Sequence, residues 1–154
     1  MEIEKKYLVS NIPENLEQYE VWEIEQSYLC TKPTIRIRKK NDDYILTYKC
    51  HRSDIQKNKK ICVADEVELP LTQEAYEHLK KKADGNVIQK SRYRIPYQDY
   101  MIELDIFHGD YEGLLLAEVE FSSMEDSECF LPPDWFLKDV SGDYHYSNSY
   151  LANK

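Results

Sequence analysis

Hydrophobic and polar residues alternate with a period of two along most of the chain, and few stretches show helical spacing. Because successive side chains of a strand point to opposite faces, this pattern predicts strands with one apolar face and one polar face. Short turn signals such as "NDD" at 41–43 and "GD" at 109–110 separate the segments. The eight predicted strands are 1–8, 22–30, 34–40, 43–50, 61–69, 87–97, 99–107 and 114–122.

One stretch between the strands has the spacing of a helix. Thr72 is a good N-cap residue, Ala75, Leu79 and Ala83 recur at helical intervals, and Gly85 is a typical stop. The sequence therefore predicts a packing helix between these two ends.

Near the end of the chain, residues 134–152 predict one or two short helices that close the fold. With the strands, they indicate a mainly β fold of the α+β class. Eight antiparallel strands are enough to close a β-barrel, so we expect a closed eight-stranded barrel with a few flanking helices. No repeat or linker indicates a second domain, and we expect residues 1–154 to form one.

The polar faces of the predicted strands carry charges that are sorted by sign. "IRIRK" contributes two arginines and "DEVEL" two glutamates, each pair spaced by two residues. Any single strand of this kind is ordinarily half exposed with its charges in water. Taken together, the like charges on neighbouring same-face positions favour a lining that faces a charged ligand. The acids are Glu2, Glu4, Glu66, Glu68, Glu103, Asp105, Glu118 and Glu120, and the bases are Lys6, Arg36, Arg38, Lys49, Lys90, Arg92 and Arg94.

This set of charges has a chemical meaning if it lines the interior of a barrel. Carboxylate oxygens are the ligands that hard divalent cations prefer, and arginine and lysine are the usual partners of phosphate. A lining with separate clusters of both predicts a site for a metal complex of a polyphosphate. No glycine-rich phosphate-binding loop is present, so side chains must bind the phosphates.

Composition narrows the possible partners and compartment. The 154 residues carry a net charge of −9, which disfavours nonspecific attraction to nucleic acid or to an anionic membrane surface. The beginning of the chain is charged where a signal peptide would be apolar, so we expect a soluble, cytoplasmic protein. The four cysteines have no zinc-ligand spacing and are interpreted as reduced, mostly structural thiols.

An ordered set of motifs resembles one known family. "EIEKKYLV" resembles the E-x-E-x-K signature of the CYTH domain, named for bacterial adenylyl cyclase CyaB and thiamine triphosphatase, within the triphosphate tunnel metalloenzymes. The similarity continues along almost the whole chain through "QSYL", "IRIR", "LTYK", "EVEL", "KSRY", "ELDIF", "AEVEF" and "DVSGDYHYSNSYLA". The resemblance implies an eight-stranded antiparallel tunnel that binds a triphosphate and a divalent metal.

The resemblance also implies roles for individual residues. Lys6 and Lys49 would help to bind the phosphates and to activate the attacking water. The other phosphate ligands would be Arg36, Arg38, Lys90, Arg92 and, from the terminal helix, Lys138. The metal ligands would be Glu2, Glu4, Glu118 and Glu120, with Glu66, Glu68, Glu103 and Asp105 in supporting roles. At His145 the chain differs from relatives that often carry arginine there.

The sequence thus predicts a Mg²⁺- or Mn²⁺-dependent hydrolase acting on a triphosphate, with inorganic triphosphate favoured because the chain is short. The alternatives are a nucleoside or thiamine triphosphatase, a class IV adenylyl cyclase, or a noncatalytic polyphosphate-binding module. We expect a monomer or homodimer whose partner is this small-molecule substrate, with neither nucleic acid nor membrane involved.

Overall fold

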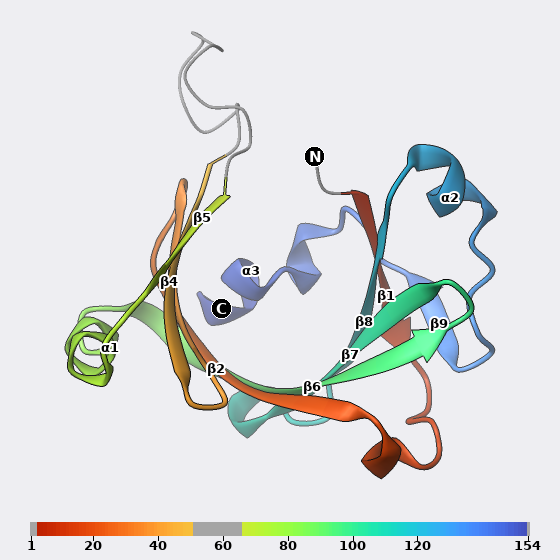
Figure 1. The fold of residues 1–154 in the computed structure, drawn as a ribbon. Coiled ribbons are helices and arrows are strands. Elements are labelled where there is room, and N and C mark those ends of the chain that lie inside the picture. Colours follow the sequence, from red (N-terminus) through yellow and green to blue (C-terminus); the bar gives the residue numbers. More distant parts are fainter. Residues whose placement is uncertain (1–2, 51–65, 154) are drawn as a thin grey trace, which may run out of the picture. The chain divides into compact units, whose positions relative to one another are not determined.

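The computed structural model describes residues 3–50 and 66–153, which form a mainly β, antiparallel fold (Figure 1). Within these residues there are nine strands and three α-helices. The strands are β1 (Ile3–Val9), β2 (Glu20–Thr31), β3 (Thr34–Lys40), β4 (Asp43–Lys49), β5 (Glu66–Pro70), β6 (Asp84–Tyr97), β7 (Tyr100–His108), β8 (Leu115–Phe121) and β9 (Phe136–Asp139). The helices are α1 (Gln73–Lys80), α2 (Met124–Cys129) and α3 (Asn148–Ala152).

Most of the predicted elements are confirmed, with corrections near the two predicted helical regions. All eight predicted strands have counterparts among β1–β8. The predicted helix begins at its Thr72 cap but ends at Lys80, because Gly85, the expected stop, already lies in β6. The segment 134–152 is not only helical, since it begins with β9.

Hydrogen bonds order the strands as β5-β4-β3-β2-β6-β7-β8-β1-β9. Among the described residues, β5 and β9 are therefore the two edges, and no ladder joins them. The antiparallel sheet is confirmed, but these hydrogen bonds do not close it into the expected eight-stranded barrel.

The chain divides into two compact units, each built from two separate segments. The first unit comprises Met1–Trp22 and Lys90–Tyr146, and the second comprises Glu23–Gln89 and Ser147–Lys154. Strands β2 and β6 each run from one unit into the other. The single domain expected over residues 1–154 stays a prediction.

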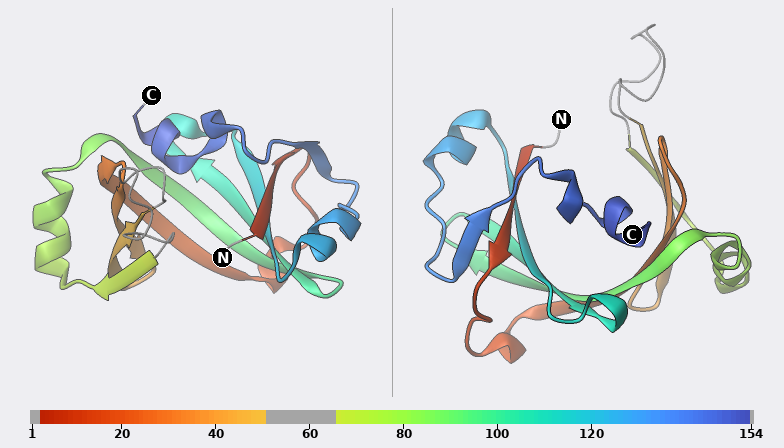
Figure 2. Two further views of the ribbon diagram at one scale, coloured as in Figure 1. Left: turned by 90° about the horizontal axis from the view of Figure 1, so that it is seen from above. Right: turned by 180° about the vertical axis from the view of Figure 1, so that it is seen from behind.

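The core of the first unit lies on the apolar face of β1, β6, β7 and β8. Its buried side chains are Tyr7, Val9, Ile95, Ile102, Leu104, Ala117, Val119, Phe121 and Phe130. Phe130, directly after α2, packs against the rings of Tyr7 and Phe121 at centroid distances of 6.2 and 5.3 Å. Helix α2 lies beside β1 and β8 in both views of Figure 2. The apolar face is thus covered, and the charged face of the same strands points the other way.

In the second unit, α1 contacts β3 and β4. The Thr72 hydroxyl caps this helix by accepting a hydrogen bond of 3.1 Å from the Ala75 amide. Tyr76 is fully buried, contacts the tilted ring of Tyr44 at a centroid distance of 5.0 Å and donates a 2.8 Å hydrogen bond to the Glu25 carboxylate. Helix α1 therefore lies on the face of β2–β4 that carries Glu25 and Tyr44.

Helix α3 also belongs to the second unit and meets β6 at a glycine. Gly85 has φ +71°, and a Cβ atom built on it would collide with the carbonyl oxygen of Ala152. Glycine permits this close approach because it has no Cβ atom, and it also adopts this left-handed backbone conformation without strain.

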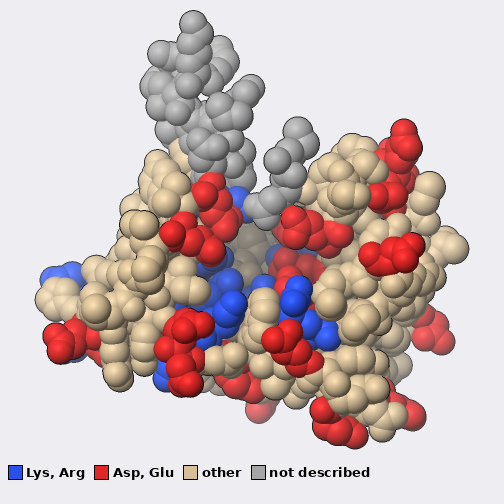
Figure 3. Space-filling view, in the orientation of Figure 1, with Lys and Arg blue, Asp and Glu red and all other residues tan. Residues whose placement is uncertain are grey.

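Acidic side chains are widely distributed over the face shown in Figure 3, in line with the net charge of −9. No helix in the described part of the chain is long and apolar enough to cross a membrane. Cys30, Cys50 and Cys129 are free thiols, and Cys62 lies outside the described residues.

Candidate functional site

Strand pairing places the predicted charged residues of the first unit side by side. Lys6 of β1 is opposite Glu118 of β8, which is in turn opposite Glu103 of β7. Two residues along β1, Glu4 is opposite Glu120. The alternation seen in the sequence therefore becomes a continuous charged surface across three neighbouring strands.

Lys6 is held at the centre of this surface. Its ammonium nitrogen donates a 3.0 Å hydrogen bond to the carbonyl oxygen of Tyr146 and lies 3.7 Å from a carboxylate oxygen of Glu118. The Lys6 side chain is 17% exposed, so the ammonium group remains reachable from solvent.

Arg92, Asp105 and Lys90 form a buried ionic network beside Lys6. Arg92 donates two hydrogen bonds, of 2.7 and 2.9 Å, to the two oxygens of Asp105. Lys90 reaches the same carboxylate at 2.9 Å, and neither its side chain nor that of Asp105 is more than 1% exposed. Arg92 also lies within 3.7 Å of Glu103 and Glu118. These contacts fix the orientation of the Arg92 guanidinium group.

The pKa values of this network follow from its charges. Burial alone would raise the pKa of Asp105, but the attraction of Arg92 and Lys90 and their hydrogen bonds hold it well below its usual range. Burial would likewise lower the pKa of Arg92, and Asp105 more than offsets this effect. Asp105 and Arg92 are therefore charged at neutral pH.

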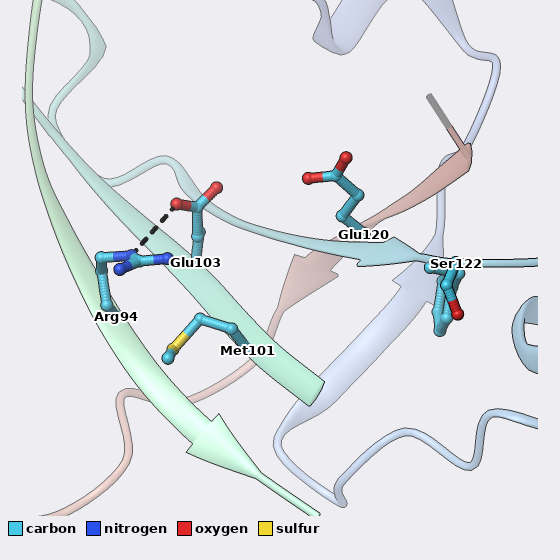
Figure 4. Close-up of a pocket in the computed structure, with 6 residues that line it drawn as sticks. Arg94, Met101, Glu103, Glu120 and Ser122 are labelled. Carbon is cyan, nitrogen blue, oxygen red and sulfur yellow. Dashed lines mark ion pairs between the residues drawn. The ribbon is translucent and has the colours of Figure 1, made fainter. Parts of the chain in front are cut away.

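A pocket of about 340 Å³ adjoins the charged surface, and Glu103, Glu120 and Arg94 are among the residues that line it (Figure 4). The Arg94 guanidinium group lies 3.5 Å from Glu103 and 4.7 Å from the ring centroid of Trp22. In Figure 4 the carboxylates of Glu103 and Glu120 project from neighbouring strands on the same side of the sheet. Glu120 is thus accessible to a ligand.

The second unit has its own charged surface on β3, β4 and β5. Arg36 is opposite Thr47, which is opposite Glu68, and hydrogen bonds of 3.3 and 3.4 Å connect the three side chains in that order. The Nε atom of Arg36 is buried and has no hydrogen-bond partner among the described residues. Two residues further along β4, Lys49 is opposite Glu66 of β5, and its ammonium nitrogen lies 3.8 Å from a carboxylate oxygen of Glu66.

Arg38 is held from the neighbouring strand β2. Gln26 is directly opposite Arg38, and its side-chain oxygen accepts a 2.9 Å hydrogen bond from Arg38 Nε. Gln26 is fully buried and donates in turn to the hydroxyl of Tyr28 at 3.4 Å. The two arginines of "IRIR" thus share one face of β3 and are each fixed by a neutral side chain.

The donor set for a metal ion is incomplete within the described residues. No group of three or more histidine, cysteine, aspartate or glutamate side chains that could hold a metal is found in residues 3–50 and 66–153. Glu2 lies outside these residues, whereas Glu4 and Glu120 are opposite each other and exposed. Mg²⁺ typically takes only one or two carboxylates, and substrate phosphates and waters complete its shell. The chemistry of this pair therefore fits such an ion.

Two further positions singled out in the sequence, Lys138 and His145, are exposed. Lys138 lies on β9 and is exposed, so the expectation that a terminal helix carries it is wrong. His145 is exposed as well, with Nδ1 2.8 Å from a carboxylate oxygen of Asp143. Of the predicted site residues, Lys6, Lys90, Arg92, Glu103, Asp105 and Glu118 lie together in the first unit, and Arg36, Arg38, Lys49, Glu66 and Glu68 lie together in the second.

Sequence reasoning missed the neutral residues of these surfaces. Gln26 and Thr47 carry no charge and therefore do not stand out in a search for sorted charges. The signal that could have found them is their place within "QSYL" and "LTYK", on the same strand face as the predicted lysine and arginine ligands.

Comparison with known proteins gives a consistent result, although no family model matches the chain. An inorganic triphosphatase of Nitrosomonas europaea is 33% identical over 156 residues, covering 98% of this chain and 96% of that protein. An inorganic triphosphatase of Acetivibrio thermocellus is 32% identical over 152 residues, covering 98% and 92%. The crystal structure of the inorganic triphosphatase NE1496 superposes with a TM-score of 0.76 at 30% identity, covering 100% of this chain and 95% of that one.

Proposed function

The chain belongs to the family of inorganic triphosphatases, within the CYTH group of triphosphate tunnel metalloenzymes, and on this premise we propose that it hydrolyses inorganic triphosphate. The observation that carries the proposal is the similarity to two inorganic triphosphatases over 98% of the chain. The charged surface of each unit supports it, because each surface carries the lysine and arginine side chains that bind a highly charged anion.

Each unit carries guanidinium and ammonium groups that are suited to bind phosphate. Arg36 is suited to this role, because a phosphate oxygen would satisfy its buried, unpartnered Nε atom. Arg38 is fixed through its own Nε, which orients its planar group. Lys49 and Arg92 add charge from β4 and β6, and Lys90 acts with Asp105 to hold Arg92.

Glu4 and Glu120 are the residues that would hold Mg²⁺ or Mn²⁺, together with Glu118 and with Glu2, which lies outside the described residues. When bound, such a cation supplies neutralisation of phosphate charge. Without such a cation the carboxylates would repel a bound phosphate, so their position beside a phosphate site favours a role in holding a cation.

Lys6 is placed to hold the attacking water. Its ammonium group is oriented by Tyr146 and Glu118 and lies in register with the carboxylates. Glu118 lies 3.7 Å from this ammonium group and can accept a proton from a water held there. The bases that bind the phosphates stabilise the charge that develops on the leaving group. The enclosed tunnel expected from the sequence is part of this proposal.

The test is a substrate panel on the purified protein. Inorganic triphosphate, pyrophosphate, ATP, GTP and thiamine triphosphate are each supplied with Mg²⁺ or Mn²⁺, and phosphate and cyclic AMP are measured. We expect phosphate release, greatest with inorganic triphosphate. Cyclic AMP formed from ATP would assign a cyclase instead, and binding without turnover would leave only a polyphosphate-binding module.

A further inference from the structure

We propose that Gln26 is a positioning residue that orients Arg38 for binding triphosphate without adding charge to the site. The inference rests on the proposed function, since it assigns a role to a residue in the same site. It follows from the juxtaposition of one fully buried amide and one arginine on adjacent strands of the second unit.

The buried amide of Gln26 is held by hydrogen bonds at both ends. Its side chain is fully buried, and burial of an amide is unfavourable unless hydrogen bonds satisfy it. Both ends of the amide are used: the oxygen accepts from Arg38 Nε at 2.9 Å, and the nitrogen donates to Tyr28 at 3.4 Å. The side chain therefore has one fixed orientation, with its oxygen toward the arginine.

The hydrogen bond to Gln26 restricts the orientation of the Arg38 guanidinium group. A guanidinium group is planar, so a hydrogen bond to Nε fixes the plane and thereby the direction of the two terminal nitrogens. Arg38 has three further rotatable bonds along its stem, and their disorder would reduce phosphate affinity. Gln26 reduces this loss because it orients the group before the substrate arrives.

The side chain of Gln26, which accepts the hydrogen bond from Arg38, is neutral. Arg92 of the first unit is held by Asp105, so a carboxylate partly cancels its charge. Gln26 holds Arg38 with a neutral oxygen instead, as Thr47 does for Arg36. A neutral acceptor fixes an arginine without itself adding a negative charge beside the phosphate site, whereas a carboxylate at the position of Gln26 would add one.

A double-mutant cycle tests the proposal. Gln26→Met keeps the volume but removes the acceptor, and Gln26→Glu keeps an acceptor but adds a negative charge. In the wild-type background we expect each to raise the KM for triphosphate by about tenfold and to change kcat much less. In the Arg38→Ala background Gln26→Met should not raise KM further, because the residue through which Gln26 acts is gone. Gln26→Glu should raise KM less than in the wild-type background, because only the repulsion by the added charge remains.

The exposed Gln73 of α1 provides the matched control, since Gln73→Met should leave both constants unchanged. Equal effects of the Gln26 changes in both backgrounds would overturn the proposal, as would wild-type constants in Gln26→Met. If Gln26→Met does not fold by circular dichroism, Gln26→Glu in the two backgrounds decides. If the wild-type protein releases no phosphate, the function fails first, and the same cycle measured as the Kd of triphosphate still tests Gln26.

Discussion

At the scale of single residues, burial separates charged groups that bind a ligand from charged groups that hold another residue. Lys90 and Asp105 are within 1% of complete burial and are paired with each other, so their charges are used inside the protein. Lys6 and Glu118 retain 17% and 16% exposure and can reach a substrate. Sequence spacing assigns all four to the same face but cannot measure this difference in depth.

Replacement of the exposed carboxylates should abolish turnover without unfolding the protein. A neutral amide is a poor ligand for a hard cation, so Glu4→Gln and Glu120→Gln should each lower the rate at limiting Mg²⁺ by roughly 100-fold or more. Excess Mg²⁺ should restore part of the rate. Glu128→Gln on exposed α2 is the control, and wild-type rates in both site variants at limiting Mg²⁺ would contradict the metal assignment.

Removal of the Lys6 ammonium group should affect chemistry more than binding. If Lys6 holds the attacking water, Lys6→Ala should lower kcat by roughly 10²- to 10⁴-fold and raise KM much less, because other bases still bind the phosphates. Lys5→Ala, one residue earlier on the opposite face of β1, is the control and should keep the wild-type kcat. A fully active Lys6→Ala enzyme would refute the catalytic role.

The buried network predicts a pH-dependent loss of stability. Asp105→Asn leaves Lys90 and Arg92 buried without their carboxylate, which should cost about 3–5 kcal/mol of unfolding free energy at neutral pH. Because folding lowers the pKa of Asp105, its contribution is complete above the unfolded pKa and is lost as pH falls toward the folded value.

The difference between wild type and Asp105→Asn should therefore shrink as pH falls from about 5 to about 2 in urea denaturation experiments. A difference that stays constant over this range would mean that the Asp105 carboxylate does not stabilise the folded state by ionic pairing.

At the scale of elements, period-two alternation identified the strands because one face of each is buried. In β7 and β8 the predicted charged positions Glu103 and Glu118 lie on the face opposite the one that places Ile102 and Val119 in the core. The short strand β9 was missed, since four residues give too little alternation to detect. The contact of α3 with Gly85 joins residues far apart in sequence, so no local pattern encodes it.

This contact predicts the effect of a single methyl group. Gly85→Ala places Cβ against the Ala152 carbonyl and imposes a left-handed backbone on alanine, which should cost roughly 2–5 kcal/mol of unfolding free energy. Gly113→Ala is the control for backbone strain alone, because φ there is +101° and no atom lies within 4 Å of the added Cβ. Equal losses in thermal denaturation would show that α3 does not pack against Gly85.

At the scale of the whole molecule, an acidic chain binds an anion by restricting its cations to particular strand faces. The net charge of −9 would repel triphosphate from an average surface. Arg36 and Arg38 share one face of β3, so this face presents two guanidinium groups although the net charge of the chain is negative. The sorted charges predicted one charged lining, whose described residues the structure places on strand faces of both units. The sequence could not predict Gln26, whose role depends on burial and pairing across strands.

The most direct test of this account is kcat/KM for inorganic triphosphate compared with kcat/KM for ATP, measured on the wild-type protein with Mg²⁺. We predict that ATP is hydrolysed weakly or not at all. The kcat/KM for inorganic triphosphate should be clearly larger, and its products should be phosphate and pyrophosphate. An equal or larger kcat/KM for ATP, or no turnover of triphosphate at any Mg²⁺ concentration, would contradict it.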